Sequence, residues 1–186
     1  AADLDRDGHQ EIVLINRMSG TYGPTDSFIY WGNSAHHYSE ASMSVIPAPG
    51  EAAVPTVADF NQDGHVDIAF PGGQIYPGTK SGFGVRPHHN LDIEEARGAS
   101  TADLNRDGYL DLVVTRGIGW GGSVSHGLIL WGDRHGFDRR RSTELKLGTQ
   151  LPQSPTIADF NKDGNLDLLF PDVDSPHTDI FWGNHE

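Results

Sequence analysis

The chain has 186 residues, of which 36% are hydrophobic, and this predicts one soluble globular domain or part of one. Its 26 acidic and 13 basic residues give a formal net charge of −13, which argues against a nucleic-acid partner because a basic surface is missing. Cysteine is absent, which excludes disulfides and thiol catalysis, and no apolar run is long enough to predict membrane insertion.

An acidic string at the N-terminus, ADLDRDGHQEIVL, occurs three more times, as ADFNQDGHVDIAF, ADLNRDGYLDLVV and ADFNKDGNLDLLF. The acidic parts of the four copies begin at Asp3, Asp59, Asp103 and Asp159. The first and third of these spacings are 56 residues and the second is 44, so long and short units alternate. Half of the acidic residues of the chain lie in these strings. Like charges crowded in this way are unfavourable unless a cation neutralises them.

A second signal follows each acidic string, and it reads FIYWGN, QIYPGT, LILWGD and DIFWGN in chain order. Short apolar runs separated by Gly, Pro, Asn and Asp predict strands and turns, and nothing indicates a long helix. In each unit, strand one precedes the acidic loop, strand two is a run such as VDIAF, strand three one such as QIYPG, and strand four follows SGFG or its equivalent. The first unit lacks most of strand one, and the fourth stops before strand four.

Repeats of this size with about four strands each predict an all-β fold, a β-propeller with four blades visible. We expect a single, partial propeller over residues 1–186, with blades at about 1–50, 51–94, 95–150 and 151–186. Four blades are few for a closed ring, so the prediction is a larger propeller of about seven or eight blades. Flanking segments or a second chain would supply the remaining blades.

The acidic loops share the pattern D-x-[DN]-x-D-G-x-x-[DE], which predicts Ca²⁺ ligands at positions 1, 3, 5 and 9 and a backbone carbonyl at position 7. An EF-hand is excluded because position 12 is apolar in every copy, and zinc because no His or Cys side chain occupies a ligand position. The alternative without a metal ion is a set of polar turns whose Asp and Asn side chains cap the backbone. The predicted ligands, for up to four Ca²⁺ ions, are Asp3, Asp5, Asp7, His9 and Glu11; Asp59, Asn61, Asp63, His65 and Asp67; Asp103, Asn105, Asp107, Tyr109 and Asp111; and Asp159, Asn161, Asp163, Asn165 and Asp167, with His9, His65, Tyr109 and Asn165 acting through their carbonyls.

These loops, together with the YWGN and GF segments, resemble the FG-GAP/VCBS-type repeats, the calcium-loop blades of the integrin alpha propeller and of many bacterial secreted proteins. The resemblance covers essentially the whole chain. It implies that each calcium loop joins the innermost strand to the next, on one face of the disc. Glu11 departs from the pattern, because the other three copies have Asp at that position.

The loops between strands two and three would then lie on the opposite face, and three of them are long. They carry candidate ligand-binding residues of the types that stack on and hydrogen-bond a sugar or grip an acidic peptide: Arg17, Tyr22, Arg116, Trp120 and His126. The structural alternative is that these Gly-rich loops simply vary. Two other clusters favour structural readings, His88–His89 as a solvated turn and Arg139–Arg141 as a charged outer strand.

Enzyme signatures such as G-x-S-x-G, HExxH and the P-loop are absent, so no catalytic residue is predicted and an enzyme is the less favoured class. The favoured hypothesis is a secreted or cell-surface calcium-binding propeller, a ligand-binding or adhesion module for an extracellular glycan or protein. Millimolar calcium outside cells suits weak sites of this kind. The alternatives are the propeller domain of a carbohydrate-active enzyme resembling a polysaccharide lyase, and a calcium-stiffened spacer.

Overall fold

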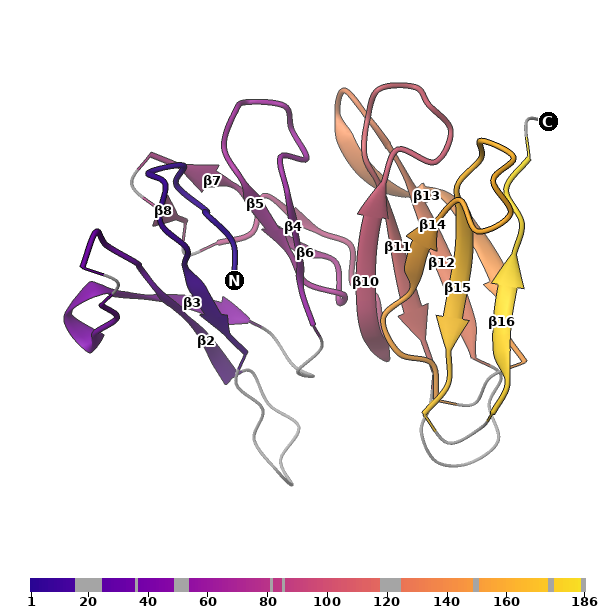
Figure 1. Ribbon diagram of the computed structural model, residues 1–186, viewed down its shortest axis with the longest axis horizontal. Coiled ribbons are helices and arrows are strands. Elements are labelled where there is room, and N and C mark those ends of the chain that lie inside the picture. The colour runs from indigo at the N-terminus through magenta and orange to yellow at the C-terminus, as the bar shows by residue number, and fades with distance from the viewer. Residues whose placement is uncertain are drawn as a thin grey trace.

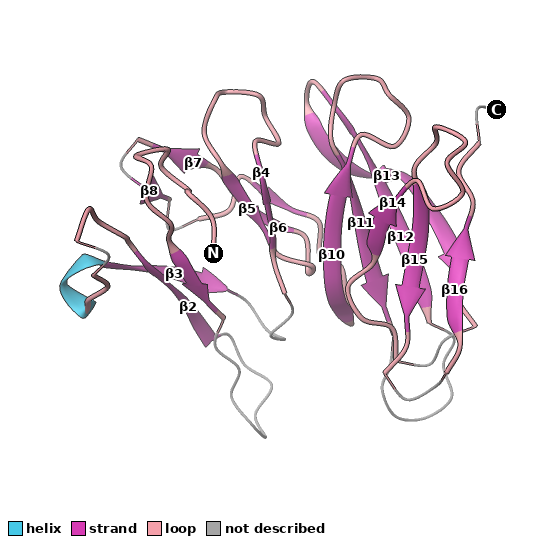
Figure 2. Ribbon diagram, in the orientation of Figure 1, coloured by secondary structure: helices cyan, strands magenta, loops and turns pink. Residues whose placement is uncertain are grey.

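The computed structural model describes residues 1–15, 25–35, 37–48, 54–80, 82–84, 86–117, 125–148, 151–173 and 176–184. Within these ranges the chain forms antiparallel β-sheets and one short 3₁₀ turn (Figures 1 and 2). Among the described residues, no helix is long and apolar enough to cross a membrane. The predicted all-β class is therefore confirmed.

The first sheet contains three strands in the order β1-β2-β3: β1 (Ile12–Leu14), β2 (Thr25–Tyr30) and β3 (Met43–Ala48). The 3₁₀ turn η1 (Glu40–Ser42) leads into β3. The acidic residues 3–11 precede β1, so this sheet begins with the second strand of a blade, as the sequence predicts.

The second sheet has the order β4-β5-β6-β9, with β4 (Thr56–Ala58), β5 (Asp67–Ala69), β6 (Gln74–Tyr76) and β9 (His89–Asn90). A small hairpin, β7 (Gly78–Thr79) and β8 (Gly82–Phe83), is inserted between β6 and β9. His89 therefore belongs to the fourth strand of this blade and is half-buried, whereas the sequence analysis assigned His88–His89 to a solvated turn.

The third sheet is the most regular, with the order β10-β11-β12-β13. Its strands follow one another up and down: β10 (Ala96–Ala102), β11 (Asp111–Arg116), β12 (His126–Asp133) and β13 (Gly136–Lys146). The three consecutive arginines lie in β13, the outer strand, as expected, and Arg140 pairs there with Asp138. The fourth sheet, β14-β15-β16, stops after its third strand: β14 (Thr156–Ala158), β15 (Asp167–Pro171) and β16 (Thr178–Phe181).

The four sheets stand side by side in chain order, as blades of a propeller do (Figure 1). Apolar residues fill each of the three junctions, and each junction draws on two neighbouring sheets. For example, Phe60 and Ile75 of the second blade pack with Leu112 and Leu130 of the third. The first strands are innermost, since β10 contacts both β4 and β14. The described residues do not close into a ring, and the total blade number and blade limits remain predictions.

Candidate metal centres

Each acidic loop joins the first to the second strand of its blade, except that the first loop here precedes β1 directly. All four loops lie on one side of the sheets, the upper side in Figure 1. Their backbones share one conformation. The fourth and sixth loop residues both have positive φ: Arg6 62° and Gly8 90°, Gln62 58° and Gly64 91°, Arg106 60° and Gly108 91°, and Lys162 60° and Gly164 90°. Glycine at position six was expected from the sharp turn; the left-handed residue at position four was not.

Side chains hold this conformation by accepting hydrogen bonds from the loop backbone. In the second loop, Asp59 accepts the N–H groups of Asp63 (3.0 Å) and Gly64 (2.9 Å), and Asp63 accepts that of His65 (2.8 Å). The same bonds recur in the third and fourth loops. The capping expected if the loops are polar turns is therefore present, and it holds the loop backbone in one conformation.

A buried carboxylate at position nine closes every loop. Asp67 accepts the N–H of Phe60 at the start of the loop (2.9 Å) and that of Gly78 after β6 (2.8 Å). Glu11, Asp111 and Asp167 make the same pair of bonds in their blades. The longer Glu11 side chain is thus accommodated. In each blade the carboxylate fastens the acidic loop to the end of the third strand.

This arrangement explains the glycine in the recurring YWG, YPG, LWG and FWG segments. A Cβ on Gly78 would lie 2.1 Å from the backbone oxygen of Val66, and one on Gly132 would lie 2.1 Å from that of Leu110. Only glycine lets the third strand approach the loop closely enough for its N–H to reach the buried carboxylate.

Burying these carboxylates has an electrostatic cost. Burial raises the pKa of Glu11, Asp67 and Asp111; the two backbone N–H groups oppose this shift, and the neighbouring loop aspartates add to it. Two carboxylates 4 Å apart repel by about 4 kcal/mol at an effective dielectric constant of 20. A cation in the loop would offset both the burial and the repulsion.

The first loop provides the clearest test of whether the residues present fit a metal ion. Asp3, Asp5 and Glu11 each place a carboxylate oxygen within 4.8 Å of the others. Asp3 Oδ1 is buried and accepts no hydrogen bond. The donors are oxygens throughout, which is the ligand set that Ca²⁺ prefers. The residues of the first loop therefore fit a calcium ion, with Asp3, Asp5 and Glu11 close enough to share it.

Neighbouring loops are connected through the left-handed residue at position four. Arg6 Nη2 lies 3.9 Å from Asp59 of the second loop, and Gln62 Nε2 donates to the Gly108 carbonyl of the third (2.6 Å). Arg106 donates in turn to the Gly164 carbonyl of the fourth loop. The left-handed backbone thus directs one long polar side chain from each of the first three loops to the next.

On the proposed ligand face, the structure brings together two of the five candidates. Arg116 and His126 are paired across β11 and β12, so their side chains lie on one face of the sheet. Arg116 Nε donates to the Glu94 carbonyl (3.2 Å), and His126 Nδ1 lies 2.8 Å from Glu144 Oε1. The other three candidates, Arg17, Tyr22 and Trp120, lie outside the described residues.

Residues 3–70 and 103–170 each match the FG-GAP-like repeat, and the two matches together cover more than half of the chain. The chain belongs to the FG-GAP-like repeat family. Each match starts at the first aspartate of one acidic loop and ends just beyond the next loop, so all four loops are included. A comparison with curated proteins found no match. FG-GAP-like repeats agree with the propeller-type arrangement of the four sheets.

Proposed function

We propose that each acidic loop binds one Ca²⁺ ion, up to four per chain, and that the ions stabilise a propeller-type binding module. The observation that carries this proposal is the repeated geometry: a preformed loop, crowded with oxygen donors, closed by a buried carboxylate. Bound calcium would neutralise these charges and crosslink the loop. The residues that hold it would be those at positions 1, 3, 5 and 9, with the carbonyl at position 7.

Calcium stoichiometry tests this assignment at a single loop. Asp63 is exposed at position five of the second loop, so Asp63→Ala is expected to lower the stoichiometry from four ions to three. Isothermal titration calorimetry on the metal-free chain measures this number. Asp26→Ala, which removes an exposed acid outside the loops, is the matched control and should keep four ions. Four ions in the Asp63 variant would contradict the proposal.

We further propose that the module acts outside the cell, where it binds a glycan or protein ligand. Membership of the FG-GAP-like repeat family supports this role, as does the pairing of Arg116 with His126 at the end of the sheet opposite the acidic loop. An array of glycans and extracellular proteins, probed with the calcium-loaded chain, tests it. If neither Arg116→Ala nor His126→Ala changes the binding of the ligand, these two residues are not part of the ligand face.

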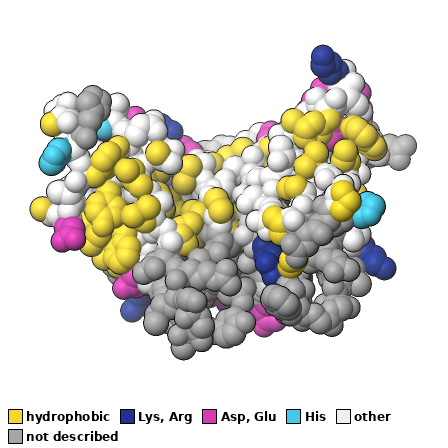
Figure 3. Space-filling model, turned by 60° about the horizontal axis from the view of Figure 1, so that its bottom comes forward, with side chains coloured by type: hydrophobic (Ala, Val, Ile, Leu, Met, Phe, Trp, Pro, Cys, Tyr) yellow, Lys and Arg dark blue, Asp and Glu magenta, His cyan; other side chains and the backbone are white. Residues whose placement is uncertain are grey.

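The outer faces of the first and fourth blades support a further proposal, that additional blades of the same type pack there. Hydrophobic side chains gather at both ends of the molecule in Figure 3. Phe60 and Ile75 are 6% and 3% exposed inside a junction, whereas the corresponding Phe160 and Ile180 are 40% and 42% exposed. At the other end, Leu14 is also exposed. Further blades, from this chain or a second one, would bury both faces.

Self-association of the isolated chain tests this packing. Trp182 is 57% exposed on the outer face of the fourth blade, so Trp182→Ser is expected to weaken association at least tenfold. Sedimentation velocity over a range of concentrations measures it. Val173→Ser, at an exposed apolar residue that follows β15, is the control. A chain that stays monomeric at all concentrations would contradict packing between copies.

A further inference from the structure

The second blade departs from the other three in the residue that precedes the conserved glycine. Where three repeats have tryptophan before the conserved glycine, it has Pro77. In the first blade, Trp31 stacks on Phe83 of the next blade, with ring centroids 6.2 Å apart, and its Nε1 donates to Ser44 (2.8 Å). Trp131 of the third blade also donates from Nε1 and packs against the junction with the fourth. Pro77 supplies neither a large ring nor a donor.

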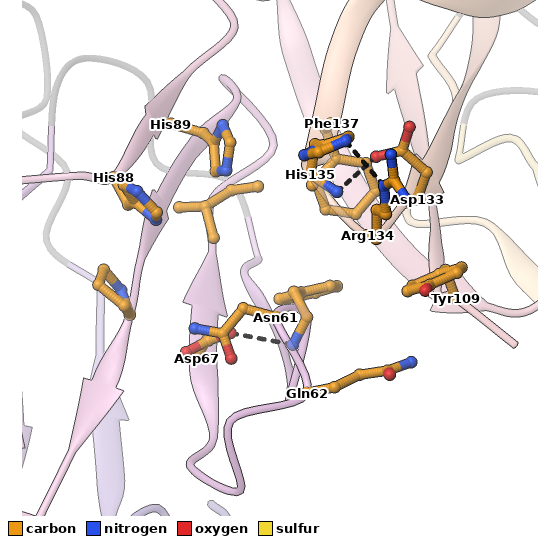
Figure 4. Close-up of a pocket in the computed structure, with 14 residues that line it drawn as sticks. Asn61, Gln62, Asp67, His88, His89, Tyr109, Asp133, Arg134, His135 and Phe137 are labelled. Atoms are coloured by element: carbon orange, nitrogen blue, oxygen red, sulfur yellow. Dashed lines mark hydrogen bonds between the residues drawn. The ribbon is translucent and has the colours of Figure 1, made fainter.

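Pro77 lines a hollow of about 450 Å³ between the second and third blades (Figure 4). Its apolar surface comes from Phe60, Ile75, Pro77 and Phe137. Phe137 holds the place in the third blade that Phe83 holds in the second, since both follow the turn glycine of their blade. The hollow therefore lies where a tryptophan would otherwise stack, and its volume is within the range of small-molecule sites.

Nitrogen groups surround the opening. Figure 4 shows His88 and His89 on one wall, and Arg134 and His135 on the other. The two adjacent imidazole rings have centroids 4.8 Å apart. Arg134 Nε donates to His135 Nε2 (2.9 Å), which leaves the other N–H groups of the exposed guanidinium directed to solvent or a ligand.

The acidic groups of the hollow are already engaged. Asp133 pairs with Arg141 and accepts the backbone N–H of His135 (2.6 Å). Asp67 accepts two backbone N–H groups. Hydrogen-bond donors therefore remain available around an apolar interior, and this combination favours an anionic group attached to a ring.

We propose that this hollow binds a six-membered ring bearing a carboxylate. The ring takes the place of the missing tryptophan against Phe137, and the carboxylate faces Arg134 and His135. A guanidinium is well suited to the carboxylate because its planar N–H groups can bind both oxygens. Sugar acids and aromatic acids share this chemistry. The hollow adjoins the second and third acidic loops, because Asn61, Asp67 and Tyr109 also line it, but the donors proposed for the carboxylate, Arg134 and His135, belong to neither loop.

Titration of the calcium-saturated chain with galacturonate, benzoate and glucose tests the proposal, using heteronuclear NMR or calorimetry. At least one acid is expected to bind at least tenfold more tightly than glucose. Binding of galacturonate alone identifies a sugar acid, and binding of benzoate alone an aromatic acid. Binding of neither acid, or equal binding of glucose, would overturn the proposal.

Two variants locate the binding site. Pro77→Trp restores the residue found in the other repeats and should fill the hollow, lowering affinity for the acid at least tenfold. Arg134→Ala removes an exposed side chain and should lower it at least fivefold even if the first variant folds poorly. Arg140→Ala, an exposed arginine on the same blade that pairs with Asp138, is the control and should bind as the parent chain does. Unchanged affinity in Arg134→Ala would overturn the proposal.

Discussion

Removing calcium is expected to lower the melting temperature of this chain by at least about 10 °C. A ligand present at 100 times its dissociation constant stabilises the native state by about 2.7 kcal/mol per site. For a chain of this size, 1 kcal/mol shifts the melting temperature by about 2–4 °C. Two occupied loops out of the proposed four therefore suffice. Melting followed by circular dichroism, with excess EGTA and then with millimolar calcium, measures the shift.

Magnesium is the appropriate control for this measurement. It prefers tighter octahedral geometry and retains its water, so the same concentration should restore only a small part of the lost stability. A melting temperature that neither EGTA nor calcium changes would mean that the hydrogen bonds of Asp59 and its equivalents are sufficient to hold the loops. The loops would then be capped turns, and the calcium proposal would be wrong.

The sequence predicted the all-β class and the strands named below because the relevant information is local. Alternating apolar residues, turn residues and an acidic string recur in every unit. Apart from β9, which pairs with β6 across the β7–β8 hairpin, the strands of each blade pair with their neighbours along the chain. The second-blade strands near VDIAF and QIYPG formed where expected. The loop conformation was also readable in part, because glycine at position six reports a left-handed backbone.

Features that join distant segments could not be predicted. Gln62 looks like an ordinary polar loop residue until its contact with Gly108, in the next blade, is known. Similarly, Pro77 is one substitution in a recurring motif, and its consequence depends on Phe137 across the blade junction. His89 was assigned to a turn because its pairing with Ile75 in the neighbouring strand leaves no periodic pattern in so short a strand.

The position-nine carboxylate shows the same limitation most clearly, because the sequence predicted only its metal-ligand role. The structure adds a second role, since Asp111 accepts the N–H of Leu104 (2.8 Å) and that of Gly132 (2.9 Å). Gly132 belongs to the third strand, far from the acidic string in sequence. The two roles make separable predictions about stability with and without calcium.

Replacing Asp111 by alanine is expected to cost about 2–5 kcal/mol of unfolding free energy even in the absence of calcium. Asp111 is fully buried, and its removal leaves two backbone N–H groups without an acceptor. Each unsatisfied buried donor costs about 1–3 kcal/mol. Burial raises the pKa of Asp111, so the variant also loses an unfavourable buried charge. This gain keeps the total cost below the upper end of that sum. Urea unfolding of the metal-free variant measures the loss.

Asp107→Ala provides the matched comparison within the same loop. Asp107 is exposed and accepts the N–H of Tyr109 (2.8 Å), so its loss should cost no more than about 1 kcal/mol without calcium. Adding calcium should stabilise the parent chain more than either variant, because both have lost a proposed ligand of the third loop. Equal stability of the two metal-free variants would show that the buried carboxylate does not fasten the loop. If Asp111→Ala is much less stable than Asp107→Ala in EGTA, and both variants respond less to calcium than the parent chain, then Asp111 both fastens the loop and binds the ion.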